Sequence, residues 1–206
     1  MSAVITISRQ YGSGGRLIGK LVAEKLGIPF YDREIILQAA EKSGLAAGFI
    51  EENEQKRKSF DVFPVTSVRW GIAPHSFDSL EAKIYAAQAD VITNCAKQGA
   101  CVIVGRCADY VLKGKVKCLN VYIHADDDER VKRVMEEYEE APTVKKAQKL
   151  LRDVDRNRAR HYEFYTDSLW GRANEYDLCI NSSTLGIEKS ADMLVAMYKS
   201  LIEKEN

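Results

Sequence analysis

An apolar strand that runs directly into a glycine-rich turn, with a helix immediately after it, constrains this chain more than any other feature. Residues 5–16 read Ile-Thr-Ile-Ser-Arg-Gln-Tyr-Gly-Ser-Gly-Gly-Arg, and apolar residues recur at helical spacing from Leu17 to Leu26. Glycine lets the backbone turn tightly around a ligand, and a helix N-terminus adds partial positive charge. These properties predict a phosphate cradle, the alternative being a strand-to-helix turn that merely needs glycine. The backbone of the predicted cradle belongs to Gly12, Ser13, Gly14, Gly15 and Arg16.

The turn departs from the P-loop pattern G-x-x-x-x-G-K-[ST]. When Gly14 is aligned with the last glycine of the pattern, Arg9 stands at the first glycine and Gly15 at the lysine. Arg16 and Leu17 then stand where the hydroxyl residue that binds magnesium would be. We expect Arg9 or Arg16 to take over the cationic role, because both lie at the loop and arginine binds phosphate well.

Apolar runs alternate with helical patterns along the rest of the chain, which is typical of a single α/β domain with a parallel sheet. Residues 44–78 are the least regular part and predict short helices and a flap inserted in the main fold. The strands are predicted at residues 3–8, 101–104, 119–123 and 178–180. The helices are predicted at residues 17–26, from 33 onward, and at 80–98, 126–138, 143–165 and 187–202.

Two arginine-bearing segments lie outside the first turn. Arg106 follows Gly105 at the end of an apolar strand, where open α/β sheets bind ligands, so its guanidinium group is expected at the crevice. Residues 152–162 are rich in arginine and contain no lysine, and Asp155 and Arg158 share one helical face. A solvated charged face is the usual interpretation of such a run, but the choice of arginine favours phosphate or carboxylate recognition.

Composition limits the classes of partner. Lys and Arg total 30 and Asp and Glu total 30, so the net charge of +0 argues against a general binder of nucleic acid or of anionic membranes. RNA binding by the arginine-rich helix stays a competing use, which the scarcity of nearby aromatic residues disfavours. The N-terminus reads as a strand and not as a signal peptide. The 5 cysteines include no C-x-x-C pair and predict buried thiols in a reducing, cytoplasmic compartment.

With these motifs in place, the chain resembles the cytidylate kinase-like family of P-loop nucleoside monophosphate kinases. The matching stretches are residues 5–32, 102–112 and 155–181, which recur in the same order and cover nearly the whole length. The resemblance implies a five-stranded parallel sheet, an acceptor-binding insertion at 44–78 and a lid at about 138–158. It also implies ATP as the donor, Mg²⁺ as its ion, and small nucleotides as the partners.

The resemblance also assigns residues to the acceptor. Arg106 falls on the Gly-Arg of the acceptor site, and Asp32 falls on the Asp that opens a further acceptor motif. Asp155 and Arg158 fall on the Asp-x-x-Arg that holds the pyrimidine nucleotide. The residues that follow Asp32 depart from the family pattern, so the acceptor is left open as a nucleoside monophosphate or another small phosphorylated or hydroxylated metabolite.

Together these features predict a nucleotide-dependent phosphotransferase, because phosphoryl transfer mainly needs positioning and charge neutralisation. Ser13 is the hydroxyl nearest to the expected magnesium. The alternative is a nucleotide-binding sensor or pseudokinase without turnover, which the missing lysine and hydroxyl favour; the oligomeric state stays open. The predicted clamp on the transferring group consists of Arg130, Arg133, Arg152 and Arg158.

Overall fold

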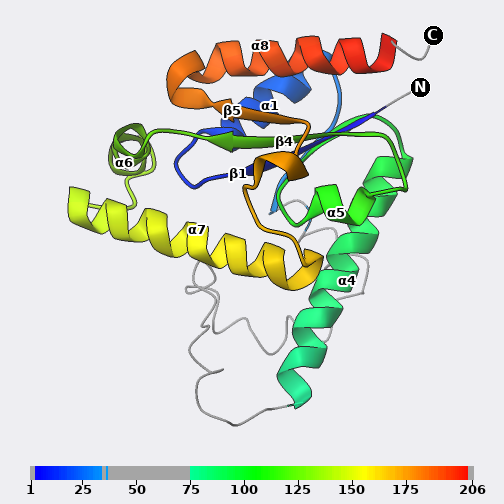
Figure 1. Ribbon diagram of the computed structural model, residues 1–206, viewed down its shortest axis with the longest axis horizontal. Helices are drawn as coiled ribbons and strands as arrows, with labels where there is room; N and C mark the ends of the chain where they lie inside the picture. The colour runs from blue at the N-terminus through cyan, green and yellow to red at the C-terminus, as the bar shows by residue number, and fades with distance from the viewer. Residues whose placement is uncertain (1–2, 34–35, 37–74, 204–206) are drawn as a thin grey trace.

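A five-stranded parallel sheet forms the centre of the computed structural model, which describes residues 3–33, 36 and 75–203 (Figure 1). Its strands stand in the order β2-β3-β1-β4-β5, and each neighbouring pair is parallel. The carboxyl ends of β1 and β3 therefore meet at one edge of the sheet. The strands are β1 (Val4–Arg9), β2 (Phe30–Tyr31), β3 (Cys101–Val104), β4 (Cys118–His124) and β5 (Leu178–Asn181).

Helices cover both faces of the sheet, with α1 and α8 on one side and α4, α5 and α7 on the other (Figure 1). The last helix contains a non-helical residue, Gly186, with φ 76° and ψ 167°, which divides it near its start. In the part of the chain that the structure describes, no helix has the length and apolar character needed to cross a membrane. The helices are α1 (Gly15–Leu26), α4 (His75–Lys97), α5 (Ala108–Leu112), α6 (Asp127–Glu136), α7 (Val144–Thr166) and α8 (Ser182–Glu203).

The core divides into two layers because neighbouring side chains of a strand point to opposite faces of the sheet. Ile5 packs in the cluster that α1 and α8 cover, whereas Val4 packs in the cluster that α4 and α5 cover. All four residues of β3 are buried, which is why the sequence shows a continuous apolar run there. A third, smaller cluster joins α6 to the first half of α7.

The sequence-based prediction of an α/β fold with a five-stranded parallel sheet is confirmed. Two short elements, β2 and α5, were absent from that prediction. Residues 44–74 of the predicted insertion lie outside the described residues, while 75–78 belong to α4. The predicted lid comprises the turn before α7 and the first half of α7; its closing function stays a prediction.

Truncation of a core residue on α8 is expected to destabilise the fold. Leu194 is completely buried, so Leu194→Ala should lower the free energy of unfolding by about 2–5 kcal/mol through lost burial and a cavity. Met197 on the same helix is 41% exposed, and Met197→Ala should change stability by less than about 1 kcal/mol. Urea denaturation of both variants measures the difference, and similar losses would show that α8 does not pack as described.

Candidate active site

The glycine-rich turn between β1 and α1 has the backbone geometry expected of an anion cradle. Gly12 and Gly14 have φ of 74° and 75°, in the left-handed region that glycine adopts without strain. Gly14 is also the N-cap of α1, no side chain caps this helix, and its first turn carries no acidic residue. The amides of Gly12, Gly14 and Gly15 make no hydrogen bond to any residue that the structure describes. They are therefore available to an anion, which the helix dipole also favours.

Arginines of α6 hold the opposite side of this turn. Arg130 Nε donates to the carbonyl oxygen of Tyr11 at 2.8 Å, and Arg133 Nη1 donates to that of Gly12 at 2.6 Å. Gly12 must stay a glycine here, because a Cβ would lie 3.0 Å from the Arg130 carbonyl oxygen. Arg130 and Arg133, which the sequence analysis expected at the transferring group, thus position the backbone of the loop in this structure.

Asp155 of α7 completes this support. Its Oδ1 accepts a hydrogen bond from the Tyr11 amide at 2.7 Å, and its Oδ2 pairs with Arg130 Nη2. Burial raises the pKa of the Asp155 carboxyl group, while the Tyr11 amide and Arg130 oppose that shift. The predicted contact of Asp155 with an acceptor stays a prediction; the contacts of the carboxylate in this structure are with the loop and with α6.

Three further guanidinium groups gather on the ligand side of the turn, from the ends of β1 and β3 and from α7. Arg158 Nη1 donates to the Arg9 carbonyl oxygen at 3.1 Å, and its guanidinium carbon lies 5.2 Å from the centroid of the Tyr11 ring. Burial, then Arg158 and Arg106, lower the pKa of Arg9 well below its ordinary value. Burial and the nearby Arg33 likewise lower the pKa of Arg106 to about 9.

Among the described residues, this arginine cluster, Arg9, Arg106 and Arg158, has more guanidinium groups than carboxylates that oppose their pKa shifts. Asp32 is the carboxylate that opposes the shift at Arg9, and Asp155 is the one that opposes it at Arg158. Neither Arg9 nor Arg106 makes a side-chain hydrogen bond or ion pair within residues 3–33, 36 and 75–203. Partly buried guanidinium groups in this state are suited to a polyanion, because an anion would relieve their mutual repulsion.

A strained turn places Arg106 in this cluster. Gly105, Arg106 and Cys107 follow β3 with φ of 81°, 58° and 53°, and two of the three are not glycine. Such residues cost of order 1–3 kcal/mol each and concentrate at functional sites. Cys107 Sγ lies 3.6 Å from His161 Nδ1 of α7, so the turn is also packed against that helix. The sequence pointed to Arg106 but carried no signal for the left-handed residues.

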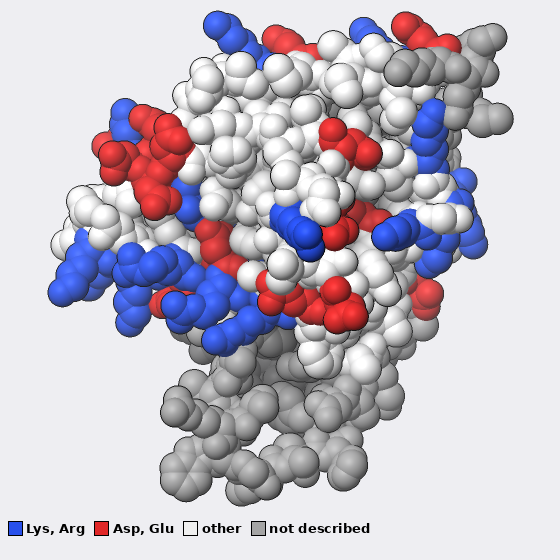
Figure 2. Space-filling model, viewed as in Figure 1, with Lys and Arg blue, Asp and Glu red and all other residues white. Residues whose placement is uncertain are grey.

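The remaining predicted residues lie around this centre. Arg16 donates through Nε and Nη2 to Asp32 Oδ2, at 2.8 and 2.7 Å, and its side chain is 64% exposed. Arg152 is exposed on α7, and Figure 2 shows a band of Lys and Arg along this helix. The structure therefore brings Arg9, Arg106 and Arg158 together, but it does not bring Arg152 to them.

Ser13, the predicted magnesium ligand, does not fit that role in this structure. It is completely buried, its Oγ donates to the Gln10 carbonyl oxygen at 2.8 Å, and its own carbonyl accepts from Ser182 Oγ at 2.6 Å. The Ser13 hydroxyl thus closes the turn onto Gln10, and the Ser182 hydroxyl fastens the turn to the start of α8. Among the described residues, no group of three or more His, Cys, Asp or Glu is placed to hold a metal ion.

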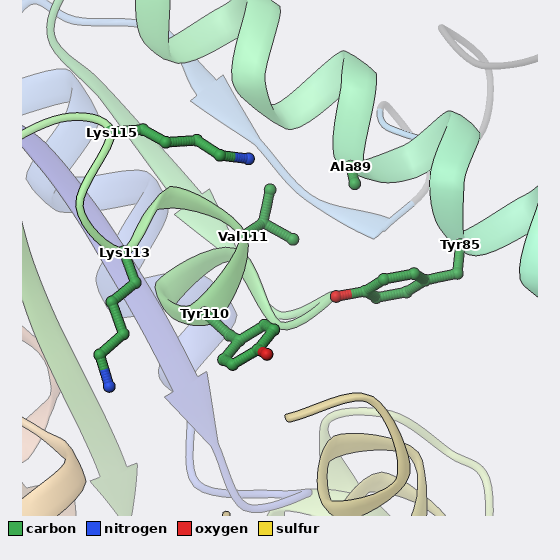
Figure 3. A pocket seen from close by; sticks show the side chains of 6 residues that line it. All are labelled: Tyr85, Ala89, Tyr110, Val111, Lys113 and Lys115. Carbon is green, nitrogen blue, oxygen red and sulfur yellow. The ribbon is translucent and has the colours of Figure 1, made fainter. Parts of the chain in front are cut away.

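A separate cavity of about 410 Å³ lies between α4 and α5 (Figure 3). None of the glycine-rich turn or of the arginine cluster lines it, so it is distinct from the candidate site. Its walls are formed by Tyr85, Ala89, Tyr110, Val111, Lys113 and Lys115.

The fold and the loop together define the class of P-loop kinases. The solved structure of an uncharacterised protein from Eubacterium ventriosum matches with a TM-score of 0.73 and 26% identity, over 97% of this chain and 99% of that one. Shikimate kinase from Bacteroides thetaiotaomicron matches in fold, with a TM-score of 0.55 and 13% identity over 97% and 99% of the two chains.

Within that class, the chain belongs to the cytidylate kinase-like family, whose sequence pattern matches residues 4–184. A cytidylate kinase from Archaeoglobus fulgidus is 25% identical over 194 residues, which are 93% of this chain and 92% of that protein. The resemblance inferred from the sequence is therefore confirmed at the level of the family.

Removal of the Asp155 carboxylate is expected to destabilise the loop support. Asp155→Ala leaves the buried Arg130 guanidinium without its main partner, which should lower the free energy of unfolding by about 3 kcal/mol. The matched control is Asp153→Ala on the same helix, because Asp153 is exposed and lies 3.9 Å from Arg156; its loss should be below about 1 kcal/mol. Equal losses in urea denaturation would contradict a supporting role for Asp155.

Mild acid is expected to destabilise the protein through His161. Burial, then Arg106 and Arg33, lower the pKa of His161 from 6.5 to about 4. Between these two values the unfolded chain binds a proton that the folded chain does not, so stability falls as the pH falls. From pH 7 to pH 5 this loss amounts to about 2 kcal/mol. Urea denaturation at both pH values should show a smaller decrease for His161→Gln, and an unchanged decrease would exclude His161 as its source.

Proposed function

We propose that this protein is a nucleotide-dependent phosphotransferase that moves a phosphoryl group from ATP to a nucleoside monophosphate or a similar small acceptor. The observation that carries the proposal is the arginine cluster beside the open amides of the glycine-rich turn. Amides and guanidinium groups around one space supply what phosphoryl transfer needs, namely fixed positions and neutralised charge. Membership of the cytidylate kinase-like family supports the same class of reaction.

The proposed roles follow the geometry. The amides of Gly12, Gly14 and Gly15 bind the donor phosphates at the N-terminus of α1. Arg106 and Arg158 bind the acceptor from the turn after β3 and from the interior of α7. The five cysteines are free thiols, and we place the reaction in a reducing, cytoplasmic compartment on that basis.

ATP is the proposed donor because the cradle accepts a phosphate chain and the cluster offers it positive charge. When bound, it supplies the phosphoryl group; the chain's own residues orient it and keep the neighbouring charges balanced. Arg9 or Arg16 would replace the lysine of the P-loop pattern. No magnesium-dependent step is assigned, since Ser13 is turned away from the cradle.

A coupled assay of ADP release over a panel of nucleoside monophosphates tests the proposal. We expect acceptor-dependent turnover with at least one of them. Arg106→Ala should reduce kcat/KM about 10²–10³-fold, because one lost donor to a transferring group costs about 2.7–4 kcal/mol. The matched control is Arg160→Ala, an arginine exposed on α7, which should retain activity within about twofold.

The second candidate function is a nucleotide-binding sensor without turnover. The inward orientation of Ser13 and the glycine at the lysine position favour it. Tight ATP binding in calorimetry, combined with no acceptor-dependent ADP release for nucleoside monophosphates or for other small phosphorylated or hydroxylated metabolites, would establish this alternative and exclude the transferase.

A further inference from the structure

The side chain of Arg9 follows an unusual path across the site. Its Cβ lies 2.6 Å, and its Cγ 3.0 Å, from where a Cβ on Gly15 would be. Farther along, its Nη1 lies 2.3 Å from where a Cβ on Gly105 would be. Arg9 therefore starts at the end of β1, crosses the first residue of α1 and ends above the turn after β3. Two glycines leave the space that this path needs.

Gly15 does not need to be glycine for its own backbone. It has no positive φ, in contrast to Gly12 and Gly14, and it begins a regular helix in which alanine is favoured. The close approach of Arg9 is thus the reason that the structure offers for a glycine at this position. Because Gly15 aligns with the lysine of the P-loop pattern, and Arg9 with its first glycine, the two residues form a pair.

Arg16, the other candidate for the cationic role, already forms an ion pair with Asp32. Its guanidinium group pairs with Asp32 on the outer side of α1, and its side chain is 64% exposed. Arg9, by contrast, has no side-chain hydrogen bond within the described residues and faces two other guanidinium groups. The Arg9 side chain thus runs from Gly15 of the glycine-rich turn to Gly105, and its guanidinium group lies beside the turn that carries Arg106.

We infer that Arg9 is the residue that replaces the P-loop lysine, and that the glycine at position 15 leaves the space that the Arg9 side chain requires. This inference rests on the proposed function, since it names the residue that binds the phosphates at the proposed site. The P-loop pattern places its cationic side chain in the first turn of the helix. In this protein the cationic side chain would instead come from Arg9, at the end of β1. A side chain at position 15 and the arginine at position 9 are then mutually exclusive.

A double-mutant cycle in the full-length protein tests this inference. The proteins are the wild type, Arg9→Ala, Arg9→Gly, Gly15→Ala and the double variant Arg9→Gly/Gly15→Ala, and the measurement is calorimetric affinity for ATP and for inorganic pyrophosphate. We expect Arg9→Ala to lose about tenfold or more, as a charge-assisted hydrogen bond is removed. Gly15→Ala should lose a comparable amount because the added methyl group displaces Arg9. In the Arg9→Gly background, which lacks the Cβ that this methyl group would meet, Gly15→Ala should change affinity by less than about twofold.

Arg16→Ala and Arg160→Ala complete the set. Arg16→Ala should lose less affinity than Arg9→Ala, and Arg160→Ala should bind as the wild type does. Circular dichroism and thermal denaturation check that each variant is folded. If Arg9→Ala does not fold, Arg9→Gln takes its place, since it keeps most of the aliphatic stem and removes only the charge.

The outcomes separate this inference from the proposed function. Wild-type protein that binds neither ATP nor pyrophosphate overturns both. Wild-type protein that binds them, with Arg9→Ala unchanged or Arg16→Ala more impaired, overturns the inference alone. Gly15→Ala losses that are equal with and without Arg9 also overturn it, because the methyl group would then act on the ligand and not on Arg9.

Discussion

Repulsion between guanidinium groups at the carboxyl edge of the sheet is the interaction on which the site depends. Arg9, Arg106 and Arg158 come from β1, from the turn after β3 and from α7, and burial lowers the pKa of each. Like charges in a low-dielectric site would move apart if their backbones were free. They stay together because the parallel register of β1 and β3 fixes two of the backbones side by side. The sheet thus holds these like charges close together, and a bound polyanion would reduce the repulsion between them.

The arginines of this protein divide between two tasks according to which side of the loop they face. Arg130 and Arg133 bind carbonyl oxygens, and so fix the left-handed turn from the side of α6. Arg9 lies at the end of β1 and Arg106 in the turn after β3, and their guanidinium groups make no hydrogen bond or ion pair within the described residues. Asp155 belongs to the first group, because its carboxylate balances Arg130 and accepts from the loop. Arginine suits both tasks because its several donors reach carbonyl oxygens and phosphates equally well.

The fold was largely predictable, because a continuous apolar run such as β3 indicates a strand that is buried on both faces of the sheet. The two-residue strand β2 was not, since its place is set by pairing with β3, as in Phe30 with Val102, and not by any local period. In the candidate site, the glycine-rich sequence predicted the tight turn that the structure shows, and the Gly-Arg pair singled out Arg106, which lies near Arg9. The hydrogen bond by which Asp155 supports the glycine-rich turn could not be predicted from the sequence, because the Tyr11 amide and Asp155 are 144 residues apart. Contacts of that range depend on how α7 packs, which sequence pattern alone does not specify.

The backbone conformations that sequence reasoning missed are also those that cost the fold most. Left-handed Arg106 and Cys107 together store roughly 2–6 kcal/mol of backbone strain, a large share of an ordinary domain's net stability. Buried apolar side chains on both faces of the sheet, including the fully buried Ile5 and Ile103, offset this cost. The strain has no structural benefit in the described contacts of Arg106, whose guanidinium makes no hydrogen bond there. The turn sets the Arg106 guanidinium beside that of Arg9, whose pKa it lowers, and the two-layered core allows the chain to hold it there.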